Sequence, residues 1–200
     1  MAVLSLQEVF NQNRYQLKYA AVMSSSWFKQ QAILLKQTGI TGRRALRDND
    51  DLNWDHKIVP GRLYLYMYDA KHKATLPYWD KFPLVFPLHQ TKDGTGFYGL
   101  NMHYLPYEYR IKILNQLIEI DLSKNTDRKK LILSWQLITN ASKLKFLEPC
   151  LHMYLYNHLQ SGLKQIYPKD WATAMLLPVQ QFVGASNTKV WRESIKRATL

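Results

Sequence analysis

The sequence of 200 residues has only one cysteine, Cys150, and no apolar stretch long enough to cross a membrane. A lone cysteine excludes an internal disulfide and a zinc site built on cysteine pairs, and it is typical of a reducing compartment. We expect Cys150 to be a buried, inert thiol. A spanning helix needs about 20 apolar residues, so the sequence predicts no membrane segment, and its start lacks the pattern of an export signal.

Acidic residues are also scarce, with 15 Asp and Glu against 27 Lys and Arg, a formal net charge of +12 and a pI of about 9.7. Such a positive field favours polyanions such as nucleic acid or an anionic membrane surface, although solubility or docking on an acidic protein would explain it too. Basic residues outnumber acidic ones by seven to three in 1–50, seven to six in 51–110 and thirteen to six in 111–200. The two flanks therefore carry the charge.

Motifs of catalysis are missing as well. The segment GTGFYG, residues 94–99, lacks the strand-to-helix context of a phosphate-binding loop and predicts a hairpin turn. His152 and His158 are six residues apart, which would place them on different faces of a helix. A nuclease could hold magnesium with the carboxylates of Asp48, Asp50, Asp51 and Asp55, but a solvated linker explains this cluster better. We predict no enzyme, no metal site and no cofactor.

The order of periodic patterns predicts an α+β fold. Residues 1–56 indicate two helices, separated at Ser24–Ser26, and a basic linker. Residues 57–106 alternate as strands do, first in RLYLYMYD, then in PLVFPL and FYGLNMHY, and predict a small SH3-like β-barrel or a strongly bent sheet. Residues 107–200 predict a C-terminal helical region, so that helices flank the β-module on both sides.

Four helices are expected in the C-terminal region. YEYRIKILNQLIEI begins after Pro106, and DRKKLILSWQLITNAS follows Asn125 and Thr126. FLEPCLHMYLYNHLQSGLKQIY is predicted as a third helix between Pro149 and Pro168, and NTKVWRESIKRATL as a last one capped by Asn187.

The candidate binding residues are cations in five clusters, each able to neutralise phosphates without reading bases. The clusters are Arg43, Arg44 and Arg47; Lys71 and Lys73; Arg128, Lys129 and Lys130; Lys143 and Lys145; and Arg192, Lys196 and Arg197. Ordinary surface charge would produce similar clusters.

Polar and aromatic residues of the β-module have simpler interpretations. Tyr64, Tyr66 and Tyr68 on one strand face could stack on exposed bases, but we favour packing under the helices. Asp69 and Asp80 are predicted as turn residues.

The segment PGRLYLYMYDAKHKATLPYWDKFPLVFPL, followed by GFYGLNMHYLPYEYR, resembles the DNA end protector proteins of T-even-like tailed phages. The shared pattern is a Pro-Gly before a Tyr-rich strand, an Asp-x-Lys turn, Leu-Pro-Tyr, Pro-Leu-Val, Gly-Leu-Asn and His-Tyr-Leu-Pro before an Arg-bearing helix. The resemblance implies turn and packing roles for Gly61, Gly99, Asn101 and Pro106, and a helix-start anchor at Arg110. It implies no catalytic residue.

The resemblance implies a non-enzymatic phage protein that binds the end of linear double-stranded DNA and shields it from host exonuclease, in the virion and then in the host cytoplasm. The alternative is a structural virion protein of the neck, tail or baseplate, whose basic surface docks on acidic neighbours. A metal-dependent nuclease is the third interpretation. The expected partners are therefore double-stranded DNA ends and other virion proteins, and no membrane.

Overall fold

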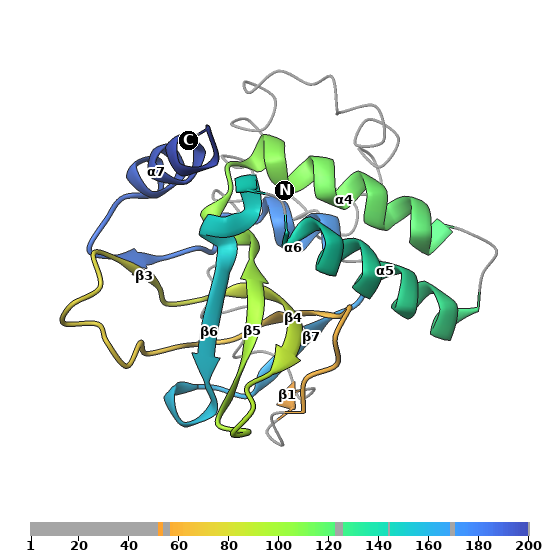
Figure 1. Cartoon of the computed structure of the whole chain (residues 1–200), viewed down its shortest axis with the longest axis horizontal. Coiled ribbons are helices and arrows are strands. Elements are labelled where there is room, and N and C mark those ends of the chain that lie inside the picture. Colours follow the sequence, from red (N-terminus) through yellow and green to blue (C-terminus); the bar gives the residue numbers. More distant parts are fainter. Residues whose placement is uncertain (1–51, 54–56, 123–125, 144, 169–170, 200) are drawn as a thin grey trace, which may run out of the picture.

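The computed structural model describes residues 52–53, 57–122, 126–143, 145–168 and 171–199. The two predicted N-terminal helices, the linker with Arg43, Arg44 and Arg47, and the Asp48–Asp55 carboxylates lie outside the described residues. The rest forms an antiparallel sheet with helices packed on it, which confirms the predicted α+β class (Figure 1).

The main sheet has six strands in the order β1-β7-β2-β4-β5-β6, with all pairs antiparallel. Their bounds are β1 Leu52–Asn53, β2 Leu63–Leu65, β4 Leu84–Gln90, β5 Gly96–Asn101, β6 Leu151–Leu155 and β7 Leu163–Ile166. The sheet curves, and a bridge joins Tyr68, just past β2, to Leu159, just past β6. It is a bent sheet with β1 and β6 at its edges; the closed SH3-like barrel is not formed.

The hairpin predicted at residues 94–99 joins β4 to β5. Gly94 adopts a positive φ of 68° at the turn, a conformation that costs glycine little. Thr91 exchanges hydrogen bonds with Gly96 across the base of the turn, and the Asp93 carboxylate accepts the Thr95 amide and hydroxyl. Gly94 therefore forms the predicted turn, while Gly96 and Gly99 lie in β5.

The helix predicted between Pro149 and Pro168 is wrong. This segment forms the 3-10 helix η3 Lys145–Cys150, strand β6, the 3-10 helix η4 Tyr156–His158 and strand β7. β6 pairs with β5 and β7 with β2, so the sheet takes two strands from far along the chain. Partners so distant in sequence leave no local signal of their pairing.

Three longer helices confirm the predicted ones: α4 Tyr107–Leu122, α5 Asp127–Ala141 and α7 Asn187–Thr199. The Thr126 hydroxyl accepts the Lys129 amide and caps α5. The cap of α7 is different from the prediction, because the hydroxyl of Ser186, and not a group of Asn187, accepts the Lys189 amide. A short helix, α6 Trp171–Leu176, packs against α4.

Two apolar cores hold the layers together. The larger lies between the sheet and helices α4 to α6, and includes Leu84, Phe86 and Leu100. The smaller lies inside the bend of the sheet, where Tyr66 and Tyr68 pack edge-on against Tyr154 of β6. Tyr64 is buried in the same cluster, so all three tyrosines pack inside the molecule, but they do so in this second core and not under the helices as predicted.

Two glycines confirm the packing roles implied by the resemblance. Gly61 has a positive φ of 87°, and an added Cβ would lie 2.8 Å from the Leu131 carbonyl oxygen of α5. At Gly99, a Cβ would lie 2.4 Å from Cγ1 of Val85 in the neighbouring strand. Each glycine thus allows a close approach that a side chain would prevent.

Candidate functional site

The first candidate site is a row of cations on α5, η3 and α7, which we call the cationic row. Its members are Arg128, Lys129, Lys130, Lys143, Lys145, Lys189, Arg192, Lys196 and Arg197. α5 leads into η3, and η3 packs against α7, so the three elements follow one another across the molecule (Figure 1). All these side chains are exposed except that of Lys130, which is half-buried.

Arg128, Lys129 and Lys130 occupy the first turn of α5. Cations at a helix N-terminus oppose the helix dipole, and each costs about 0.3–1 kcal/mol. Only one acidic residue, Asp127, lies in this turn to offset them. The three cations therefore do not serve helix stability.

Lys143 and Lys145 lie beyond the other end of α5. The helix has 15 residues, so the two groups are about 22 Å apart along its axis. A separation of this length matches several phosphates along a duplex, which repeat about every 3.4 Å per strand. The two clusters could thus contact well-separated phosphates of one DNA molecule.

On α7, Lys189, Arg192 and Lys196 follow one another at steps of three and four residues, and so lie on one face of the helix. The opposite face is buried through Val190 and Ser194. Lys189 was missing from the predicted set. Its spacing from Arg192 would have found it, because helical periodicity applies to charged residues as it does to apolar ones.

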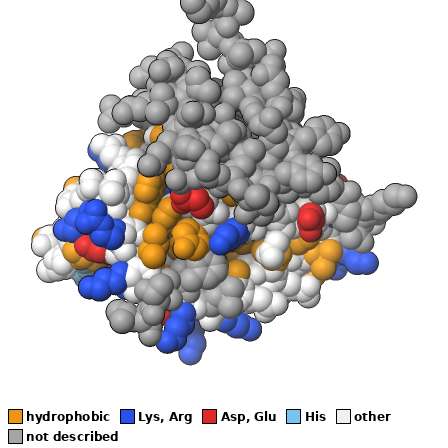
Figure 2. All heavy atoms as spheres, turned by 90° about the horizontal axis from the view of Figure 1, so that it is seen from above, with side chains coloured by type: hydrophobic (Ala, Val, Ile, Leu, Met, Phe, Trp, Pro, Cys, Tyr) orange, Lys and Arg blue, Asp and Glu red, His pale blue; other side chains and the backbone are white. Residues whose placement is uncertain are grey.

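Lys71 and Lys73 lie apart from this row, in the exposed loop between Tyr68 and β3 Trp79–Asp80. The Lys73 ammonium donates to the Asp69 carboxylate at 2.7 Å, so an internal partner already neutralises it. Asp69 is thus an ion-pair partner in addition to lying at a turn. On the face seen in Figure 2, Lys and Arg side chains lie at several points around the border and also near the centre, beside exposed hydrophobic side chains.

Arg110 has the opposite environment, because it is fully buried in α4. Its guanidinium donates to the carbonyl oxygens of Leu105, Met175 and His103 at 2.8, 2.9 and 3.1 Å, and lies 4.6 Å from the centre of the Tyr107 ring. Burial lowers its pKa to about 10, which still leaves it charged at neutral pH. Arg110 joins the start of α4 to α6, which confirms its implied role as an anchor.

Asp80 is more than the predicted turn residue. It is buried and accepts the Phe82 and Gln181 amides, the Asn101 side chain and, at 2.8 Å, the His103 ring. Burial opposes its ionisation, but the charge and hydrogen bonds of its partners outweigh burial and hold its pKa below the ordinary value. Asp80 thereby ties β3 to β5, η2 Met102–Tyr104 and the segment before β8 Phe182–Val183.

This buried polar group has the composition of an acid-base pair, and one of its two residues, Asp80, also lines the groove described below. His103 and Asp80 are both buried, and the nearby thiol of Cys150 is also buried, which raises its pKa. A thiol that stays protonated is a poor nucleophile. Within the part of the chain that the structure describes, no group of three or more His, Cys, Asp or Glu is placed to hold a metal ion.

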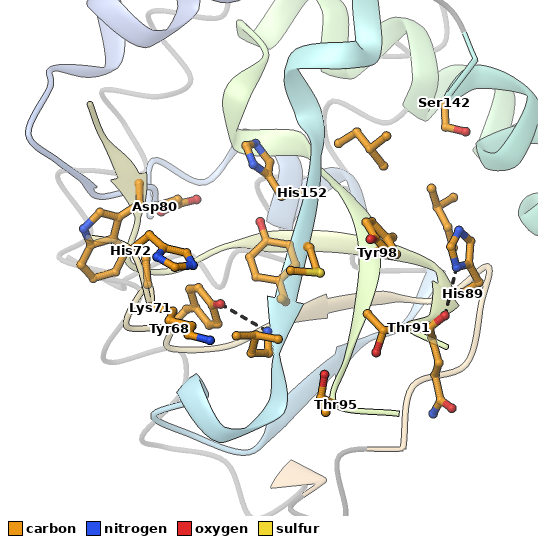
Figure 3. A pocket seen from close by; sticks show the side chains of 18 of the residues that line it. Tyr68, Lys71, His72, Asp80, His89, Thr91, Thr95, Tyr98, Ser142 and His152 are labelled. Atoms are coloured by element: carbon orange, nitrogen blue, oxygen red, sulfur yellow. Dashed lines mark hydrogen bonds between the residues drawn. The ribbon is translucent and has the colours of Figure 1, made fainter. Parts of the chain in front are cut away.

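The second candidate site is a groove of about 1270 Å³ along strand β6. Figure 3 shows β6 passing between two groups of lining residues, with Lys71, His72 and Asp80 on one side and His89 and Tyr98 on the other. Trp135, Thr139 and Ser142 of α5 and its C-terminal end line it as well. Sequence reasoning missed this site, because its residues come from five separate segments.

No helix among residues 52–53, 57–122, 126–143, 145–168 and 171–199 is both long and apolar enough to cross a membrane. A search of curated proteins and a search of solved structures each returned no match. The family model described as phage T4 terminal DNA protecting protein matches residues 21–194. This match covers most of the chain and includes the segment that carries the resemblance. The chain therefore belongs to the family of the phage T4 terminal DNA protecting protein.

Proposed function

We propose that this protein binds the terminus of linear double-stranded DNA and shields it from exonuclease, without cutting it. The observation that carries the proposal is the family match over residues 21–194, because the family is described by terminal DNA protection. The protein would act in the virion and, after entry, in the cytoplasm of the host. Blocking a nuclease requires only occupancy and steric cover, so the mechanism needs no catalytic group.

In this proposal the cationic row supplies phosphate contacts. Its helix α5 packs on α4 and β4, and its helix α7 packs on η3 and η2, so the cations are presented from packed elements. Neutralised phosphates release counterions, and binding therefore weakens steeply with salt. Lys71, and Arg43, Arg44 and Arg47 from the predicted set, extend the proposed contacts. Lys73 contributes less, because Asp69 pairs with it.

The test is exonuclease protection of a linear duplex by the purified full chain with magnesium present. Closed-circular duplex of the same sequence serves as competitor, since it offers the same phosphates and no end. We expect protection to survive an excess of circular DNA. Protection that circular DNA removes would mean general duplex binding; intact DNA without protection would favour a virion assembly part; and loss of DNA without added exonuclease would identify a nuclease.

A further inference from the structure

Where the groove along β6 faces α5, the sheet side of the groove is lined by apolar and aromatic side chains. In the sheet, Tyr98 of β5 pairs with His89 of β4 on one side and with Met153 of β6 on the other, so the three form one cross-strand row. The rings of His89 and Tyr98 lie 5.1 Å apart. Met153 is 49% exposed, and Leu151, two residues along the same strand, is 40% exposed.

Residues of α5 line the opposite side of this part of the groove, and the two sides together are called the wall below. Trp135 is 39% exposed and lines the same groove, as do Thr139 and Ser142 one and two turns further along. Exposed tryptophan, methionine and leucine side chains in the lining of one groove are unusual for a surface whose only role is to face water.

Cations lie at both ends of this wall. Lys92 lines the groove at the β4–β5 turn, and Lys143 follows Ser142 at the end of α5; both side chains are exposed. The exposed carboxylate in the lining is that of Asp93, which already accepts two hydrogen bonds from Thr95. The exposed charge around the wall is therefore mainly positive, which complements a polyanion or an acidic surface and not a basic or neutral partner.

We propose that this part of the groove, between α5 and the β4–β5–β6 face, binds the unpaired nucleotides of a DNA strand terminus. Aromatic side chains that stack on bases, together with cations that follow the backbone, are the general means of single-strand binding. In a continuous duplex the bases are stacked and paired, so only a frayed or overhanging terminus offers them.

The inference rests on the proposed function and adds a source of preference for ends, since phosphates alone do not distinguish an end from the middle of a duplex. Trp135 and Tyr98 would stack on bases. Lys92 and Lys143 would contact the flanking phosphates, and Lys143 would link the groove to the cationic row. The duplex itself would lie on that row.

The experiment measures affinity by fluorescence anisotropy for three labelled duplexes of one sequence: a blunt duplex, one with a 5′ overhang and one with a 3′ overhang of about eight nucleotides. We expect the full chain to bind one of the overhangs about tenfold more tightly than the blunt duplex, a change that stacking of one or two bases would produce. The double variant Y98A/W135A should bind that overhang no better than the blunt duplex, while its affinity for the blunt duplex stays within about twofold.

Tyr167→Ala is the matched control, because Tyr167 is 51% exposed and follows β7, which is remote from β6 in the sheet. It should leave the preference for the overhang unchanged. A second variant, Met153→Glu, changes no aromatic residue and places a carboxylate in the groove, so it should also reduce the preference. Thermal melting of each variant verifies that the fold is intact.

Equal affinity of the full chain for blunt and overhang duplexes would overturn the inference, as would a preference that survives in folded Y98A/W135A and Met153→Glu. The proposed function fails differently. If blunt ends are protected from exonuclease and no overhang is preferred, only the groove proposal is wrong. If neither blunt nor overhang duplex is protected, the proposed function is wrong as well.

Discussion

Arg110 and Arg128 carry the same guanidinium group on consecutive helices, and the fold places them in opposite environments. Arg110 is fully buried and donates to three carbonyl oxygens, two of them in other segments. Arg128 is exposed in the first turn of α5, where the helix dipole disfavours a cation. The first group stabilises the fold and the second does not. Positive charge in the sequence therefore indicates a ligand only where the fold leaves that charge in water.

The largest expected effect tests the buried half of this comparison. Arg110→Met removes the buried cation and leaves the carbonyls of Leu105, Met175 and His103 without their donor. We expect the free energy of unfolding, measured by urea denaturation, to fall by about 3–5 kcal/mol. Arg128→Met should change it by about 0.5 kcal/mol or less. Equal losses in the two variants would mean that burial does not separate their roles.

The exposed half of this comparison is tested by a triple variant in which Arg128, Lys129 and Lys130 are each replaced by alanine. If each contacts one phosphate, the slope of log K against log salt should decrease by up to about three, and affinity at about 0.15 M salt should fall on the order of 100-fold. Stability should not fall, because cations leave the N-terminus of α5.

The charge-conserving variant R128K/K129R/K130R is the control for this triple replacement. Contacts that read only charge should keep both the affinity and the salt slope. An unchanged slope in the alanine variant would remove the α5 cluster from the interface, whatever the role of α7.

The half-buried His152 provides a further test, in which stability is measured as a function of pH. Burial lowers the pKa of His152 to about 4, although its ring nitrogen bonds the Pro149 carbonyl oxygen. The unfolded chain takes up this proton below about pH 6.5 and the folded chain only below about pH 4, so stability is full above the higher value and declines between the two. We expect a loss of about 2 kcal/mol, less than the full shift implies because the side chain is only partly buried.

His152→Gln should reduce this decline, since glutamine retains a donor for Pro149 and takes up no proton. His103, whose pKa burial also lowers, is present in both proteins, so their difference isolates His152. Urea denaturation at several pH values between about 4 and 7 measures the effect. Parallel pH profiles for the two proteins would contradict the assignment.

The smallest expected effect is a difference in the salt dependence of DNA binding between two exposed lysines. Lys71→Ala should lower the salt slope of DNA binding by about one, whereas Lys73→Ala should lower it less, because Asp69 already pairs with Lys73 at 2.7 Å. Asp69→Asn provides the reciprocal variant, since it releases Lys73 and should strengthen binding slightly. Identical slopes for the two lysine variants would show that the ion pair opens on binding at no cost, or that neither residue contacts DNA.

Local pattern predicted much of the fold. The hairpin around Gly94 and the helices α4, α5 and α7 were readable because their turn residues and apolar spacing are local properties. Strand β6 was predicted as helix although LHMYLY alternates aliphatic and aromatic or histidine residues, as LYLYMY does in β2 and the residues after it. That alternation was the signal that could have found it. Pro149 and Pro168, placed as the start and end of a helix, favoured the helix instead.

Of the two candidate sites, the sequence predicted only the clusters of cations. Four of the five predicted clusters have described residues, and these are exposed or half-buried, but sequence could not show that Lys73 is paired or that Lys189 joins the α7 face. The groove could not be predicted from the sequence. Tyr98, Trp135 and Met153 line one groove only when β6 pairs with β5 and α5 packs on β4. Such contacts depend on packing between segments distant along the chain.

The sequence by itself determined the α+β class, the helices with clear periodicity, the excess of positive charge and the family resemblance at residues 60–110. All of these depend on residue type and on spacing within a few turns or strands. Tertiary structure alone decided which arginine is buried, which lysine is paired and which aromatic side chains face an open groove. The physical reason is that the free-energy cost of a charged group or of an exposed ring depends on burial and on pairing with residues distant in the sequence. Neither is a property of the residues adjacent in the sequence.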